Sequence, residues 1–244
     1  MFSLFKKKIK PDLSFIGVDM HNHLLPGLDD GVQDLETTLN FVRELHAMGY
    51  SKLICTPHIL AEIHPNTPET ILPKLDLVRT ALKENDIPVA IEAAAEYMID
   101  NDMEALIRNN NQLLTFGKNY ILVEMSYLAP SPNLEQVIFA LKLKGLQPIL
   151  AHPERYLFYH NNFEKYERAI DLGCLLQVNI LSLLGYYGKH IKVIAEKLFE
   201  KNMVSLVGTD MHHINHMNAL KTLVEKKEFY KLVQNAKLIN ESLL

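Results

Sequence analysis

Short apolar stretches recur along the chain, and each is bounded by polar or turn-forming residues. Runs of β-branched and aliphatic side chains between such boundaries are typical of buried strands. The pattern predicts strands at Phe15–Met20, Lys52–Thr56, Val89–Ala95, Tyr120–Met125, Pro148–Ala151, Leu175–Ile180 and Val204–Thr209.

Helical periodicity occupies most of the intervals between these strands. It is clearest in Leu35–Met48, where apolar side chains recur on one face, Asp34 can cap the first turn and Gly49 can end the last. Further helices are predicted at Thr70–Glu84, Asn133–Lys144, Phe163–Leu172, Lys189–Lys201 and Met217–Val233, and Ile59–Pro68 is expected to be a loop. The alternation of strands and helices indicates parallel strands, in a wound sheet or a barrel.

Length and composition favour one domain. The chain has 244 residues, 48% of them hydrophobic, and neither a Gly/Ser-rich linker nor an internal repeat divides it. We expect a single domain over residues 15–244, preceded by a flexible basic segment over residues 1–14. The apolar residues of that segment precede its lysines, the reverse of the order in an export signal. Weak attraction to an anionic membrane surface is the alternative role for it.

Charge and cysteine content exclude several classes of protein. A net charge of −4, from 25 basic and 29 acidic side chains, provides no field that would gather nucleic acid. Cys55 and Cys174 form no CxxC pair, so we expect no disulfide framework and a reducing, cytoplasmic location. The most apolar window, Leu175–Tyr187, contains Gln177 and Asn179 and is too short to span a bilayer.

Histidine and acidic residues stand at the ends of almost all the predicted strands. They are His21 and His23 after the first, His58 after the second, Glu96 after the third, Glu124 in the fourth, His152 after the fifth, and Asp210 and His212 after the last. In a parallel barrel the carboxyl ends of the strands converge on one mouth. Side chains far apart in the sequence are therefore expected to meet there.

The spacing and chemistry of these residues indicate metal binding. His21 and His23 are two positions apart on an extended segment, so both imidazoles can face one cation, and Asp210 and His212 repeat the spacing. Imidazole and carboxylate without thiolate suit Mn, Fe or Zn, and there are more ligands than one ion uses. Any one of them alone is more often a hydrogen-bonded polar residue, but charges crowded at one mouth need cations to compensate them.

The stretch Asp19–Gly31, which reads DMHNHLLPGLDDG, resembles the opening motif of the polymerase-and-histidinol-phosphatase (PHP) metalloesterases, in particular the bacterial capsule-type protein tyrosine phosphatases. Later blocks resemble that subfamily in the same order, at Thr56–His58, Ala95–Tyr97, Leu122–Glu124, Leu150–Tyr156 and Thr209–His212. The resemblance spans roughly residues 16–233 and implies a distorted, TIM-like barrel of seven βα units. The strand count reaches the same number independently.

The resemblance implies three divalent metal ions, most plausibly Mn, with Fe, Zn, Mg and Co as alternatives. It assigns His21, His23, Glu96 and Asp210 to the first ion, Glu96, Glu124 and His152 to the second, and Asp30, His58 and His212 to the third. The expected chemistry is attack of a metal-activated water on a phosphate monoester. The residues alone support Asp30 least, because Asp29-Asp30-Gly31 could be a turn with a capping acid.

Arg155, three residues after His152, is the candidate to hold the phosphate oxygens in the transition state. The alternative is a surface arginine paired with Glu154. Some members of the family carry a second arginine after the final Asp-x-His, but this chain has none there. His213 and His216 are candidates to contact the phosphate instead, and a solvated loop is the alternative.

The resemblance also implies a partner, the tyrosine-rich tail of a membrane-associated bacterial tyrosine kinase that controls capsule or exopolysaccharide export. Tyr127, Tyr156 or Tyr159 could stack on the substrate ring or belong to the core or rim.

Three other functions are alternatives to a metal-dependent tyrosine phosphatase. A cysteine phosphatase is excluded, because its nucleophile needs an arginine six positions on, where Cys55 and Cys174 have Ala61 and Ile180. A histidinol-phosphate or other small-molecule phosphatase of the same superfamily, and a non-catalytic metal-binding scaffold, stay open as alternatives.

Overall fold

The structure is a computed structural model that describes residues 12–244. Residues 1–11 of the predicted basic segment, which include the lysines at positions 6, 7, 8 and 10, lie outside the described residues. Leu13, which the prediction placed in that segment, is fully buried, and its backbone N donates to Met48 O at 2.6 Å. Within residues 12–244, no helix is long and apolar enough to cross a membrane.

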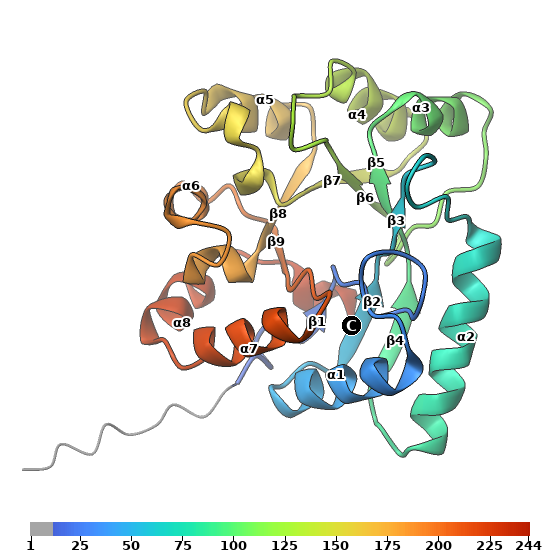
Figure 1. Cartoon of the computed structure of the whole chain (residues 1–244). Coiled ribbons are helices and arrows are strands. Elements are labelled where there is room, and N and C mark those ends of the chain that lie inside the picture. The colour runs from blue at the N-terminus through green and yellow to red at the C-terminus, as the bar shows by residue number, and fades with distance from the viewer. Residues whose placement is uncertain (1–11) are drawn as a thin grey trace, which may run out of the picture.

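Parallel strands form the centre of the molecule and helices surround them (Figure 1). The strands are β1 (Val18–Asp19), β2 (Lys52–Cys55), β3 (His58–Ile59), β4 (Ala90–Ala93), β5 (Glu96–Met98), β6 (Tyr120–Glu124), β7 (Gln147–Ala151), β8 (Leu175–Asn179) and β9 (Leu206–Gly208). Every pairing between them is parallel. Each predicted strand overlaps one of these elements, so the expected α/β class is confirmed.

The pairings follow one another around a ring. One sheet has the order β1-β2-β4 and the other has the order β3-β5-β6-β7-β8-β9. Two residues outside the named strands lead from β2 into β3, and two lead from β4 into β5. The two sheets are therefore joined along the chain at these points. A parallel bridge between Asn22 and Met211 joins the end of β1 to the end of β9. This arrangement is compatible with the distorted seven-unit barrel that the sequence predicts.

The helices are α1 (Leu35–Ala47), α2 (Pro68–Glu84), α3 (Asn101–Arg108), α4 (Leu134–Leu143), α5 (Glu164–Asp171), α6 (Lys189–Glu200), α7 (Ile214–Leu223) and α8 (Lys227–Gln234). Asp34 caps α1 as predicted, since its carboxylate accepts from Thr37 N at 2.8 Å. The loop predicted at Ile59–Pro68 is partly wrong, because Ile59 ends β3 and Pro68 begins α2, where proline suits the first helical turn.

The helices differ from the prediction in two further ways. The short helix α3 was not predicted, and the single helix expected over Met217–Val233 is two helices separated at Val224–Lys226. A continuous helix that buried Leu220 and Leu223 would turn Lys227 toward the core as well. The break instead lets Phe229 and Val233 of α8 enter the core.

Apolar side chains fill the space inside the ring below the strand ends. Val18, Ile54, Leu122, Ile149 and Leu206 form this small cluster, which is separate from the larger core that includes the buried faces of the helices. Since alternate residues of a strand share a face, the position two residues after Leu122 also points inward, and it is occupied by Glu124. The interior therefore changes from apolar to charged toward the carboxyl ends of the strands.

The seam between β1 and β9 depends on a residue near the end of the chain. Asn240 is buried, its side-chain amide donates to Val18 O at 3.0 Å and Val207 O at 2.8 Å, and its carbonyl accepts from Val207 N at 3.0 Å. One side chain thus joins β1, β9 and the last turn.

We predict that Asn240→Ala lowers the free energy of unfolding by about 3 kcal/mol, because it leaves buried backbone groups unpaired. Asn119→Ala is the matched control, since that amide makes one bond, to Gly145 O at the surface. Urea unfolding of both variants, each without added metal, measures the difference. Equal losses for the two would show that the seam does not depend on Asn240.

Candidate metal centre

The structure brings all nine predicted ligands together at the carboxyl ends of the strands. They fall into four groups whose ligand atoms lie within 4.8 Å of one another: His23, Asp30, His58 and His212; His21, His23 and Glu96; His21, His152 and Asp210; His58, Glu96 and Glu124. The groups share members, as expected of a multinuclear centre. His152 falls with His21 and Asp210, and its Nε2 also lies 2.9 Å from Glu96 Oε1 and 3.9 Å from Glu124 Oε2, the two residues with which the sequence grouped it.

The carboxylate of Glu96 lies at the middle of the cluster. Its Oε2 is 3.1 Å from His21 Nε2, 3.4 Å from His23 Nε2 and 3.2 Å from His58 Nδ1. Its Oε1 is 2.9 Å from His152 Nε2. Burial alone would raise the pKa of Glu96, but the nearby His21 and His58 outweigh it and hold that pKa well below its usual range. A carboxylate with each oxygen directed to different imidazoles is suited to bridge two cations.

Asp210 is another buried carboxylate of the cluster. Its Oδ1 lies 3.4 Å from His21 Nε2 and 3.3 Å from His212 Nδ1. Its Oδ2 accepts from Arg155 Nη1 at 3.0 Å and from Asn179 Nδ2 at 2.6 Å. Burial would raise the pKa of Asp210, but the histidines and Arg155 hold it well below its usual value.

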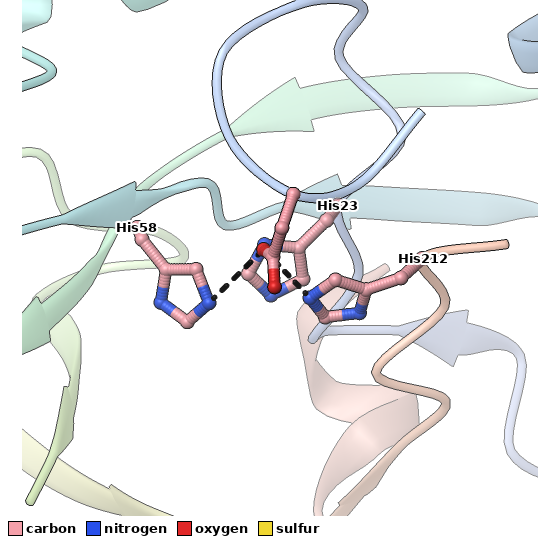
Figure 2. Close-up of side chains that lie close together, drawn as sticks. His23, His58 and His212 are labelled. Carbon is pink, nitrogen blue, oxygen red and sulfur yellow. Dashed lines mark ion pairs between the residues drawn. The ribbon is translucent and has the colours of Figure 1, made fainter. Parts of the chain in front are cut away.

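The outer group lies closer to solvent. Figure 2 shows the rings of His23, His58 and His212 converging on a carboxylate. Asp30 Oδ1 is 3.7 Å from His58 Nε2 and 3.4 Å from His212 Nε2, and 62% of the Asp30 side chain is exposed. The structure therefore places Asp30 at the cluster.

The donor set fits divalent cations better than hydrogen bonding. His58 Nδ1 is 2.8 Å from Glu124 Oε1, yet this buried nitrogen has no partner of hydrogen-bond geometry in the described chain. Histidines and carboxylates buried together at such distances carry a large desolvation cost that bound cations offset. Nitrogen and oxygen donors without sulfur match Mn, Fe or Zn.

A second set of polar side chains fixes the ligands from behind. Asp29 Oδ2 lies 2.7 Å from His23 Nδ1, and Gln177 Oε1 lies 2.8 Å from His21 Nδ1, so each Nε2 is left to face the cluster. Sequence reasoning did not assign these two residues. Gln177 and Asn179 carried a signal, because polar residues at alternate positions of an apolar strand share one face, and that face lines the site.

The backbone is strained or crowded where it meets the centre. His152 directly follows β7 and has a φ of 34°, and Asp210 lies two residues after β9 and has a φ of 51°. Both values lie in the left-handed region, which costs non-glycine residues energy. Gly31 approaches so closely that a Cβ there would lie 2.3 Å from His23 O. The Asp29-Asp30-Gly31 sequence needs glycine for this contact.

Arg155 lies beside the metal ligands. Together with Tyr127, Tyr187 and several of those ligands it lines a cavity of about 190 Å³. The alternative pairing with Glu154 is wrong, since Glu154 is fully buried and accepts from Asn179 N at 3.0 Å and Ser182 Oγ at 2.7 Å. Burial raises the pKa of Glu154 to about 7.

The other sequence candidates divide between cavity and core. His213 and His216 both line the cavity. His216 is buried, its Nδ1 accepts from His212 N at 3.2 Å, and burial lowers its pKa to about 4. Tyr156 and Tyr159 are core residues, whereas Tyr127 lines the cavity.

A parallel α/β fold that brings buried imidazoles and carboxylates together beside its strands is the arrangement found in metal-dependent hydrolases. Residues 17–241 match the model of the family described as Capsular polysaccharide synthesis, CpsB/CapC. The chain belongs to this family.

Curated relatives and a solved structure resemble the chain over nearly its whole length. It is 30% identical over 232 residues to tyrosine-protein phosphatase YwqE of Bacillus subtilis, with 91% of each chain covered. It is 26% identical over 221 residues to tyrosine-protein phosphatase CpsB of Streptococcus pneumoniae, with 86% of this chain and 90% of the relative covered. A crystal structure from work on YwqE and CpsB, described as unique metal-dependent tyrosine phosphatases, matches with a TM-score of 0.79 at 28% identity, covering 93% of this chain and 94% of the other.

We predict that Asp29→Asn weakens metal binding about 10- to 100-fold, because the amide cannot hold His23 as the carboxylate does. Titration with Mn followed by calorimetry measures the affinity. Asp34→Asn makes the same chemical change at the exposed cap of α1 and should leave the affinity unaltered. If the two variants bound Mn equally well, the Asp29–His23 contact would have no role in the centre.

Proposed function

We propose that this chain is a metal-dependent protein tyrosine phosphatase that hydrolyses phosphotyrosine at the centre described above. The observation that carries the proposal is the convergence of nine imidazoles and carboxylates, five of which line the same cavity as Arg155. The names of the relatives, as tyrosine-protein phosphatases, support the choice of phosphotyrosine.

We propose that three divalent cations bind here, with Mn preferred. Glu96 would be shared between two of them, and the outer group around Asp30 would hold the third. When bound, such cations lower the pKa of water toward ~7 and neutralise the charge of a phosphoryl group. Asp29 and Gln177 orient His23 and His21 for this task.

Arg155 is assigned to hold the phosphoryl oxygens. A guanidinium has five N–H donors, and the described chain provides Arg155 with one hydrogen-bond acceptor, Asp210 Oδ2. The side chain is largely buried, with 22% exposed, and the nearby tyrosines and Asp210 raise its pKa although burial opposes the charge. A permanently charged group with free donors in a polar cavity is suited to a phosphate.

The partner that fits is a flexible, phosphorylated tail. We propose the tyrosine-rich tail of a bacterial tyrosine kinase of capsule or exopolysaccharide synthesis, met in the cytoplasm. The family description, which concerns capsular polysaccharide synthesis, supports this choice. An extended segment can bring its phosphotyrosine into the mouth without the kinase domain fitting there as a rigid body.

The purified chain should hydrolyse a phosphotyrosine peptide when Mn is added, and chelation should abolish turnover. Phosphoserine peptide and histidinol phosphate should react much more slowly, which would separate a protein tyrosine phosphatase from a small-molecule phosphatase. Initial phosphate release on the three substrates is the measurement. Faster turnover of histidinol phosphate, or none of any substrate with Mn bound, would refute the proposed function.

Thiol alkylation is the control for this assay. Cys55 and Cys174 are buried, and burial raises the pKa of Cys174 to about 12, so neither is a reactive thiolate. Alkylation of the native enzyme should leave its turnover intact.

Substitutions at Arg155 and His152 should separate phosphate binding from metal binding. Arg155→Ala should keep the metals but lower turnover about 10²- to 10³-fold, and Arg155→Lys should recover only part of it, because a point charge cannot make the bidentate contact. His152→Ala should lose metal as well as rate. Metal stoichiometry and turnover are measured together for each variant.

Arg168→Ala is the matched control, since Arg168 is half exposed and paired with Glu135 on the surface. It should retain both metal and rate. Near-normal turnover of Arg155→Ala would instead show that Arg155 does not hold the phosphate, and that the metals or His213 and His216 bind it.

A further inference from the structure

The guanidinium of Arg155 lies against two tyrosine rings from different loops. Its Cζ is 4.5 Å from the centroid of the Tyr127 ring and 4.3 Å from that of Tyr187. Tyr127 follows β6, Arg155 ends the short turn after β7, and Tyr187 follows the helical turn after β8. Three consecutive strand ends thus contribute to one contact.

Both rings lie close under the guanidinium carbon. Each centroid is within 4.5 Å of Cζ, with the carbon over the ring. The tyrosines make no ring contact with each other, although each has other aromatic neighbours, Tyr127 with Tyr156 and Tyr187 with Tyr186. The guanidinium therefore contacts two separate rings.

The two ring contacts and the ion pair together limit the freedom of the Arg155 side chain. The rings hold its Cζ, and Nη1 donates to Asp210 Oδ2 at 3.0 Å. The described chain offers the remaining N–H groups no acceptor, and Tyr127, Arg155 and Tyr187 all line the cavity.

We propose that Tyr127 and Tyr187 are positioning residues, which hold Arg155 with its free N–H groups directed at the phosphate. The inference rests on the proposed function. It assigns the work to the ring faces and not to the hydroxyls, because the buried Tyr187 hydroxyl has no hydrogen-bond partner among residues 12–244. A cation held against aromatic faces away from water is stabilised and pre-oriented.

Tyr187 gives the cleaner test, since the Tyr127 hydroxyl also lies 3.3 Å from His152 Nε2. Tyr187→Leu should lower kcat/KM on p-nitrophenyl phosphate about tenfold and weaken inhibition by inorganic phosphate by a similar factor, as expected for loss of one such contact. Tyr187→Phe keeps the ring face and should stay within about twofold of wild type. In an Arg155→Ala background, Tyr187→Leu should have almost no further effect.

Two measurements protect the test against a change in folding. Metal content and thermal midpoint are recorded for every variant. Tyr127→Leu removes the other ring that contacts Arg155, and its loss of kcat/KM should likewise disappear in an Arg155→Ala background. Leu128→Ala is the control, because that side chain is 94% exposed and adjoins Tyr127 without contacting Arg155. It should match wild type in rate and in phosphate inhibition.

The outcomes separate this inference from the proposed function. An equal loss from Tyr187→Leu with and without Arg155, or a loss from Tyr187→Phe as large as from Tyr187→Leu, would overturn the positioning role while the wild type still turns over. A wild-type enzyme that binds Mn but hydrolyses no aryl phosphate would refute the function itself. Coupling between Tyr187 and Arg155 in the phosphate inhibition constant supports the inference.

Discussion

Charge compensation around the buried Glu96 carboxylate is the constraint on which the mouth of this protein depends. Four histidines from three segments lie within 3.4 Å of its two oxygens. Such a group is costly to bury unless its partners are held in place, so each neighbouring segment must end at a defined position. The strained backbone at His152 and Asp210 and the close approach of Gly31 are local costs of meeting that requirement.

Polar side chains behind the centre hold these ligands in a regular way. Carboxylates and amides bind the outer nitrogen of a histidine, as Asp29 does for His23 and Gln177 for His21, while the inner nitrogen faces the centre. Arg155 extends the same scheme, because one of its N–H groups secures Asp210 and the others are left for a substrate. Binding site and scaffold are thus joined through shared residues.

The sequence predicted the ligands because strand ends are visible in it. A short apolar run followed by histidine or an acid marks both the strand and its end, so eight of the nine ligands could be named from the pattern, whereas Asp30 lies in a loop and was implied only by the family resemblance. Tyr187 had no such signal, because its role comes from a loop that meets Arg155 only in three dimensions. The break between α7 and α8 did carry a signal, since a continuous helix would have turned Lys227 toward the core, but the packing of Phe229 and Val233 in a second helix is seen only in three dimensions.

The seam at Asn240 bears on when the centre can form during synthesis. His21 and Asp210 are separated by most of the chain, and the residue that joins β1 to β9 lies four positions before its end. Contacts of such long sequence separation form late and slowly. The part of the metal site that lies between these strands can therefore assemble only after the chain has been synthesised through Asn240, and until then the histidines near its amino end lack their partners.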